Sequence, residues 1–277
     1  VEHFRPVSRA ALHRFNYRNH RRVLVVDGRV GFTGGSGVGW EWMGNGLGER
    51  WRDTDVRVAG PVVRQIQGAF AENWFEATGV LLGGEAYYPP SVMAGDVRAQ
   101  AVRSAPVDGN VSMYSLFLLA ITAARRSIHI TNQYLVLDDA LTAALVGAAR
   151  RGVEVRLILP GQPTNPLVHA AGHRDVGRLL AAGIELYGYT AGRLHAKTMV
   201  VDRRWATVGS TNLDPRSFAL NDELNLVAYD DVVARRLEAI FAEDLARSRP
   251  ITRAEWEDTP LGVRLLGLLL TPFRGQL

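Results

Sequence analysis

The sequence has 277 residues, of which 47% are hydrophobic and 22% are charged, and its formal net charge is +4. A chain of this length and composition is typical of a globular protein built as two domains or two tightly joined halves. The absence of cysteine excludes a disulfide scaffold and thiolate chemistry, and the basic charge favours anionic partners such as phospholipid headgroups, anionic membrane surfaces or nucleic acid.

The N-terminal segment, residues 1–22, is rich in arginine, and apolar residues stand between the arginines. Two interpretations stay open for it, a surface that faces lipid headgroups and a solvated basic segment that leads into a strand. The arginines of this segment are Arg5, Arg9, Arg14, Arg18, Arg21 and Arg22, and the apolar residues between them are Phe4, Leu12, Phe15 and Tyr17.

A hairpin follows, because Asp27-Gly28 is a favoured type I′ turn dipeptide between two apolar stretches. Residues 31–48 are rich in glycine and lack the Gly-Lys-Ser/Thr ending of a nucleotide-binding loop. We expect this stretch to form part of the cleft wall over His20. Residues 51–58 alternate as a strand, and residues 61–78 have the apolar spacing of a helix.

Residues 79–110 are rich in turn-forming residues and predict a connection to a second unit. That unit alternates helices and strands, which predicts a largely parallel or mixed sheet that is covered on both faces. Its helices are predicted at 111–125, 138–151 and 167–182, and its strands at 127–132, 154–159 and 184–189.

The unit continues with a strand at 194–202, a two-residue turn at Asp202-Arg203 and a strand at 205–210. Such a turn pairs His195 with Ser210. Glu223 begins a further strand, and residues 231–247 form a charged helix. The leucine-rich tail, 261–273, either lies on a membrane or packs on the body of the protein.

Two side chains of the strand at 194–202 point to a function. His195 and Lys197 are two residues apart, so both side chains leave the same face of a strand. An imidazole beside an ammonium is a poor core pair, because burial of an unpaired charge is costly. The arrangement is reasonable if both groups face an anion.

The same pattern occurs earlier in the chain. The histidine and the aspartate are seven residues apart in both copies, as His20 and Asp27 and as His195 and Asp202. A glycine follows each histidine by fourteen residues. An internal repeat of this kind predicts two related units, each with one histidine and one cation.

The second copy has the spacing His-x-Lys-x4-Asp-x6-Gly-Ser-x-Asn, which resembles the signature of the phospholipase D superfamily. Its members are His195, Lys197, Asp202, Gly209, Ser210 and Asn212. The stretches 212–218 and 221–225 resemble the bacterial cardiolipin synthase branch. The first copy departs from the signature, because Arg22 replaces the lysine, Gly35 stands at the serine position and Gly37 at the asparagine position.

The resemblance implies an α/β fold, an α-β-α sandwich of two pseudo-symmetric phospholipase D-like repeats with mixed, largely parallel sheets. Residues 1–96 would be the first repeat and residues 97–277 the second, with a C-terminal helical tail. Only nineteen residues precede His20, whereas 84 residues of the second unit precede His195. We therefore expect the first repeat to be incomplete at its N-terminal end.

The resemblance also implies residue roles. His20 would be the nucleophile that forms a phosphohistidine, and His195 the general acid and base. Lys197 and Arg22 would bind the phosphate oxygens, and Ser210, Asn212 and the position of Gly35 would complete the substrate contacts. Glu223 and Asp53 would each hold an imidazole in its working tautomer. Asp27 and Asp202 belong to the motif, but their place in a turn suggests a structural role. No metal and no cofactor is expected.

These roles predict a phosphatidyltransferase that uses phosphatidylglycerol as donor and acceptor, or a phospholipase that uses water. Its partners would be anionic phospholipid and a membrane surface rather than nucleic acid, and it would be peripheral on the cytoplasmic face of the cell membrane. Two alternatives stay open. A nuclease of the same superfamily would use the same chemistry, and a non-catalytic protein that binds anionic lipid would result if the first motif has decayed.

Overall fold

A computed structural model of the chain describes residues 1–6, 16–106 and 109–276. Part of the predicted basic segment, including Arg9 and Arg14, lies outside the described residues. Two of its other arginines are held within the protein. Arg5 pairs with Glu76, and Arg21 is buried, where it donates hydrogen bonds to Glu72 and to backbone carbonyls.

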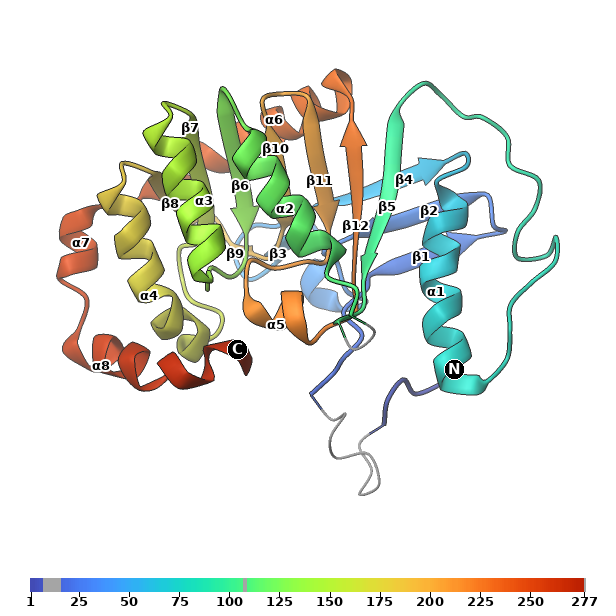
Figure 1. Ribbon diagram of the computed structural model, residues 1–277, viewed down its shortest axis with the longest axis horizontal. Coiled ribbons are helices and arrows are strands. Elements are labelled where there is room, and N and C mark those ends of the chain that lie inside the picture. The colour runs from blue at the N-terminus through green and yellow to red at the C-terminus, as the bar shows by residue number, and fades with distance from the viewer. Residues whose placement is uncertain (7–15, 107–108, 277) are drawn as a thin grey trace.

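The fold is built on a mixed sheet of eight strands in the order β13-β8-β7-β6-β10-β11-β12-β5 (Figure 1). The strands are β5 (Arg98–Ser104), β6 (Ser127–Asn132), β7 (Glu154–Pro160), β8 (Glu185–Tyr189), β10 (Lys197–Val201), β11 (Trp205–Gly209), β12 (Glu223–Tyr229) and β13 (Ser248–Pro250). Within the described part of this sheet, only β6-β7 and β7-β8 pair in parallel. The prediction of a mixed sheet is confirmed, but the sheet is not largely parallel. A tight turn after β10 and a longer connection that contains a short helix after β11 reverse the chain, so both pairs are antiparallel.

Helices cover both faces of this sheet, as the predicted sandwich requires. Figure 1 shows α2, α3 and α4 on one face and α6 on the other. The predicted helices agree with the structure to within two residues at each end. They are α1 (Val63–Thr78), α2 (Ser112–Ala123), α3 (Asp139–Arg150), α4 (Pro166–Ala181) and α6 (Asp231–Leu245). The largest core cluster packs α2, α3 and α4 on β6 and β7, and a second cluster packs α6 on β10 and β11.

The N-terminal part forms a smaller sheet in the order β1-β2-β4, with helix α1 packed on it. Its strands are β1 (Val23–Val26), β2 (Val30–Gly34) and β4 (Asp55–Ala59). The hairpin β1-β2 has the same register as β10-β11, because Val26 pairs with Val30 and Val201 pairs with Trp205.

Both hairpin loops have left-handed conformations at their first two residues, Asp27-Gly28 and Asp202-Arg203. This agrees with a type I′ turn. A third residue follows each turn before pairing begins, so the predicted two-residue loop at 202–203 is wrong by one residue. The observed register of β10-β11, extended towards His195, places this residue opposite Thr211 rather than Ser210.

Two predicted strands are interrupted, and both interruptions lie at predicted site residues. The strand at 194–202 divides into β9 (Arg193–Leu194) and β10, with His195 and Ala196 between them. The strand at 51–58 divides into β3 (Trp51–Arg52) and β4, with Asp53 and Thr54 between them. β3 pairs in parallel with β9, which ties the N-terminal part to the second unit.

The C-terminal tail packs on the body of the protein. It consists of α7 (Arg253–Glu257), α8 (Leu261–Leu269) and the 3₁₀ turn η4 (Thr271–Gln276). Leu270 at the end of α8 joins a cluster with Val136 and Val168. Among the described residues, none of the helices has the length and apolar character that crossing a bilayer requires.

Candidate active site

Two histidines are each held by a carboxylate from the other part of the chain. Nδ1 of His20 lies 3.0 Å from both carboxylate oxygens of Glu223, and Nδ1 of His195 lies 2.7 Å from Oδ2 of Asp53. Both carboxylates are buried. A hydrogen bond from Nδ1 to a carboxylate fixes the tautomer and leaves the lone pair of Nε2 available. The site therefore contains two oriented imidazoles.

Backbone hydrogen bonds connect the same two parts of the chain. The amide of His20 donates to the carbonyl of Asp222, and the amide of His195 donates to the carbonyl of Arg52. Each acceptor immediately precedes the carboxylate that holds the same imidazole. Each histidine is thus fixed at two points, which positions its ring against the neighbouring part of the chain.

Lys197 lies between these pairs and is 2% exposed. Its Nζ is 2.9 Å from Nδ1 of His195 and donates to Oε1 of Gln133 at 3.2 Å. Burial lowers the pKa of Lys197 to about 8, although the charges of Asp53 and Glu223 oppose this change. Because both carboxylates act on it, the ammonium lies within electrostatic reach of both histidine pairs.

The environment of His195 keeps its ring neutral at neutral pH. Burial and then the charge of Lys197 lower its pKa to about 4, although the hydrogen bond with Asp53 raises it. The charge of His20 also lowers it, so the two imidazoles lie within electrostatic reach of each other. Burial would raise the pKa of Asp53, but the hydrogen bond with His195 and the charges of Lys197 and His195 hold it below its usual value.

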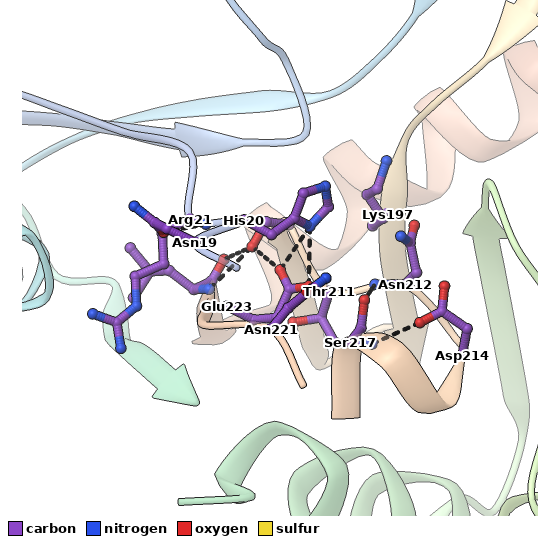
Figure 2. A network of polar contacts seen from close by, with 12 residues as sticks. Asn19, His20, Arg21, Lys197, Thr211, Asn212, Asp214, Ser217, Asn221 and Glu223 are labelled. Carbon is purple, nitrogen blue, oxygen red and sulfur yellow. Dashed lines mark hydrogen bonds and ion pairs between the residues drawn. The ribbon is translucent and has the colours of Figure 1, made fainter. Parts of the chain in front are cut away.

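Glu223 is held by its own neighbours, as Figure 2 shows. Ser210 donates a hydrogen bond from Oγ to Oε2 of Glu223, and its Oγ accepts one from the amide of Leu224. Asn221 donates to Oε1 of Glu223 at 3.4 Å. Ser210 was predicted to contact substrate. The structure instead directs its hydroxyl at the carboxylate, so it orients the Glu223–His20 pair.

Asp53 is held by a tryptophan rather than a serine. Nε1 of Trp42 donates to Oδ2 of Asp53 at 3.0 Å, and the Trp42 ring lies edge-on to His195 with 5.3 Å between centroids. A Cβ added to Gly37 would lie 2.9 Å from the Trp42 ring, and one added to Gly35 would lie 2.2 Å from Oδ1 of Asp53. The two glycines that depart from the motif therefore make room for Trp42 and Asp53.

This arrangement corrects two predictions. Residues 31–48 were expected to cover His20, but Trp42 from this stretch covers His195. Gly35 was expected at the substrate position, but it is buried against the carboxylate of Asp53. The cause is the break in the strand after Trp51–Arg52, which carries Asp53 across to the second histidine.

Three residues of the site were missed from the sequence: Trp42, Trp51 and Gln133. The ring of Trp51 lies 4.7 Å from that of His195, and Gln133 accepts from Lys197. The available signal for Gln133 was its place directly after a predicted parallel strand, where α/β proteins position ligand-binding residues. The two tryptophans carried no comparable signal, because a tryptophan in a loop more often contributes to packing than to a functional site.

Asn212 is the predicted substrate-binding residue whose side chain stays available. It is 5% exposed, and its Oδ1 has no hydrogen-bond partner within the described part of the chain. Its backbone amide donates to Oγ of Ser217, whose own amide donates to Asp214 at the start of α5 (Pro215–Ala219). Burial raises the pKa of Asp214 to about 6, although the bond from the Ser217 amide opposes this. Figure 2 shows this chain of contacts beside Glu223.

Arg22 lies close enough to the site for its charge to lower the pKa of Lys197. Its Nε is buried and has no hydrogen-bond partner among the residues that the structure describes. A guanidinium can bind two phosphate oxygens at once, so Arg22 could serve as a second cation beside Lys197.

Asp27 and Asp202 lie outside the site, at the turn ends of their hairpins. The carboxylate of Asp202 accepts hydrogen bonds from the backbone amides of Arg125, Arg126 and Ser127. Ala196 and the five residues of β10 separate Asp202 from His195, and β10 alone spans about 16 Å. These contacts support the structural role in the turn that the position of Asp202 suggested.

A separate cavity of about 220 Å³ lies beyond Gln133, between α4 and the ends of β6, β7 and β8. His169 and His173 line it, and the ring of His173 stacks on Trp256. Burial lowers the pKa of both histidines, so both are neutral at neutral pH. Within residues 1–6, 16–106 and 109–276, no three histidine or carboxylate side chains are grouped as a metal site would require.

Comparisons with known proteins identify a family that part of the chain matches. Residues 117–245 match the family described as cardiolipin synthase, phospholipase D-like domain. The chain is 39% identical over 259 residues to cardiolipin synthase A of Pseudomonas entomophila, with 92% of the chain and 54% of that protein aligned. It is 38% identical to a cardiolipin synthase of Oceanobacillus iheyensis, with 95% of the chain and 55% of that protein aligned. The chain thus spans about half the length of the curated relatives it matches.

A likeness in fold extends over nearly the whole chain. The crystal structure of a phosphatidylserine synthase from Haemophilus influenzae superposes with a TM-score of 0.67, at 12% sequence identity. The superposition covers 93% of this chain and 69% of that protein. At this identity the likeness supports the fold alone.

Proposed function

We propose that this chain, which carries a phospholipase D-like domain of the cardiolipin synthase family, transfers a phosphatidyl group through a phosphohistidine. Phosphatidylglycerol would be the donor, and the hydroxyl of a second phosphatidylglycerol the acceptor. The observation that carries the proposal is the crossed pair of imidazoles, each held at Nδ1 by a buried carboxylate from the other part of the chain.

In the first step, Nε2 of His20 attacks phosphorus, and the bond from phosphorus to the leaving glycerol oxygen breaks. His195 gives its proton to that oxygen. His20 suits the role of nucleophile because its side chain is 22% exposed, whereas the side chain of His195 is 7% exposed and packs beside two tryptophans. A bound phosphodiester places a negative charge beside His195 and would raise its pKa, so the proton is taken up with the substrate.

In the second step, His195 removes a proton from the incoming hydroxyl, and the hydroxyl oxygen attacks phosphorus. The bond from nitrogen to phosphorus breaks and His20 is regenerated. The product is cardiolipin when the acceptor is phosphatidylglycerol, and phosphatidic acid when the acceptor is water. Splitting a slow displacement into two steps is the usual benefit of a covalent intermediate.

Cations of the protein hold the phosphate in this scheme. Lys197 and Arg22 would contact its non-bridging oxygens, and the side-chain N–H group of Asn212 would donate a hydrogen bond to one of them. Charges that are already in place in a water-poor site stabilise the transition state strongly. Ser210 acts through Glu223 rather than on the phosphate.

The first motif is remodelled rather than decayed in this proposal. Trp42 donates to Asp53 as Ser210 donates to Glu223, and its ring lies against Gly37 where the family has an asparagine. A decayed motif would be expected to lose such matched contacts. We also propose that residues 1–96 and 97–277 are related halves, and the equal registers of β1-β2 and β10-β11 support this. The protein would act as a peripheral enzyme on the cytoplasmic face of the membrane.

The test incubates the protein with phosphatidylglycerol vesicles and, separately, with DNA. We expect cardiolipin and glycerol from the vesicles. His20→Ala and His195→Ala should each abolish turnover, whereas His3→Ala, which changes an exposed histidine outside the site, should keep it. With substrate labelled at phosphorus, a rapid quench into denaturant at alkaline pH, where a phosphohistidine bond survives, should leave label on the native protein but not on His20→Ala.

Cleavage of DNA without lipid turnover would favour a nuclease. Vesicle binding without turnover would favour a decayed enzyme. Unchanged turnover in His195→Ala would refute the mechanism.

A further inference from the structure

Helix α8 carries large apolar side chains on the side that faces solvent. Its exposed members have between 49% and 72% of their surface accessible. They are Leu261, Leu265, Leu268, Leu269 and, in the following turn, Phe273, and we call them the leucine face. The spacing i, i+4, i+7 and i+8 places the four leucines on one side of the helix. A surface helix normally turns its polar side to water, whereas α8 exposes its apolar side.

Packing holds α8 in this orientation. A Cβ added to Gly267 would lie 2.4 Å from the carbonyl oxygen of Ala170, so the backbones of α8 and α4 are in close contact. Leu270 packs with Val136 and Val168, and Arg274 donates to the carbonyl of Leu137 at 2.9 Å. The helix therefore cannot roll to bury the leucine face without losing these contacts.

The leucine face lies along the same edge of the molecule as the site. Figure 1 shows α8 beneath α4, and the C-terminal turn runs from it towards α5, on the side of the sheet where β6 ends. Arg216 of α5 donates to the carbonyl of Gln276, which ties the tail to α5. Asp214, which begins α5, belongs to the polar network beside His20 and Glu223 (Figure 2).

Arginines lie beside the leucine face. Residues 259–276 contain Arg264 and Arg274 and no acidic residue, although Glu255, Glu257 and Asp258 precede them and Arg274 is paired with Asp175. Arg174 of α4 joins these two arginines around a groove that also includes Leu268. Leucines next to arginines form a surface that suits an anionic lipid interface, where the apolar side chains enter the hydrocarbon and the guanidinium groups meet phosphates.

We propose that the leucine face inserts into an anionic bilayer and holds the active-site edge of the protein against the membrane. A second copy of this chain is a poorer occupant, because the arginines of two such faces would repel each other. The inference rests on the proposed function for its lipid substrate. It adds the surface by which the protein reaches that lipid.

Vesicle sedimentation at low ionic strength tests the proposal, with phosphatidylglycerol and phosphatidylcholine vesicles. The variant Leu265→Asp/Leu268→Asp places two charges on the leucine face. The matched control, Leu119→Asp/Val232→Asp, changes two equally exposed apolar residues on α2 and α6. We expect the first variant to bind phosphatidylglycerol vesicles roughly tenfold or more weakly and the control to bind as the native chain does. The native chain should prefer phosphatidylglycerol to phosphatidylcholine.

Turnover of a water-soluble, short-chain phosphatidylglycerol separates docking from chemistry, and both variants should keep it. Unchanged vesicle binding in the first variant, or an equal loss in the control, would overturn the proposal. The proposal would also be overturned if light scattering showed that the native chain is a dimer and that the first variant is a monomer. The leucine face would then bind a second copy of the chain. If no form of the protein turns over lipid but the first variant alone loses vesicle binding, docking stands and the proposed enzyme function fails.

Discussion

Replacing Trp42 by phenylalanine should impair catalysis while leaving the fold intact. The change removes the Nε1 donor that lies 3.0 Å from Oδ2 of Asp53 and keeps a ring near His195. A hydrogen bond to a charged group contributes about 1.5–3 kcal/mol. If that stabilisation is needed to keep Asp53 on His195, kcat should fall roughly tenfold to a hundredfold, because about 1.4 kcal/mol corresponds to a factor of ten in rate.

The assay is steady-state formation of cardiolipin from phosphatidylglycerol, with KM and kcat measured separately over a range of pH. We expect the loss in kcat, because Trp42 acts on the acid and base rather than on the lipid. Trp40→Phe is the matched control, since Trp40 lies in the same 3₁₀ turn, η2 (Trp40–Trp42), and its ring is stacked under Arg50. Thermal unfolding of both variants checks the fold. A Trp42→Phe enzyme with native kcat and an unshifted pH profile would refute the reasoning.

Three further predictions concern the cations and the glycine beside Asp53. Because burial lowers the pKa of Lys197 to about 8, the ammonium is charged below this pH and is lost above it, so kcat/KM should fall as pH rises through about 8. In Lys197→Arg, any decrease in kcat/KM at alkaline pH should move to higher pH. If kcat/KM of that variant still falls near pH 8, the decrease belongs to another titrating group. Gly35→Ala should reduce kcat/KM by about tenfold or more, because the added Cβ would lie 2.2 Å from Oδ1 of Asp53, and normal kinetics would show that Asp53 can move freely. Arg22→Lys should preserve or raise activity, and a large loss measured in the same assay would show that the guanidinium itself is required.

Much of the fold follows from local patterns in the sequence. The helices and the strands at 127–132 and 154–159 are bounded by apolar periodicity and by capping residues such as Asp138 and Gly152. The strand directions in the second unit did not follow from these patterns. A helix between two strands predicts parallel pairing for β6, β7 and β8, but β10 joins β6 in the opposite direction by a route that local periodicity does not encode.

For the site, the spacing of the repeated motif named His20, His195 and Lys197, whereas Glu223 and Asp53 were named from the resemblance to the phospholipase D superfamily. Spacing along one strand also implied that His195 and Lys197 meet, and Nζ lies 2.9 Å from the ring. Which carboxylate serves which imidazole was not available from spacing. The answer depends on the pairing of β3 with β9 and of Asn19 with Asp222, contacts between residues more than 140 positions apart. Such contacts form only when the whole chain is packed, and they are also what brings Trp42 to His195 and directs Ser210 to Glu223.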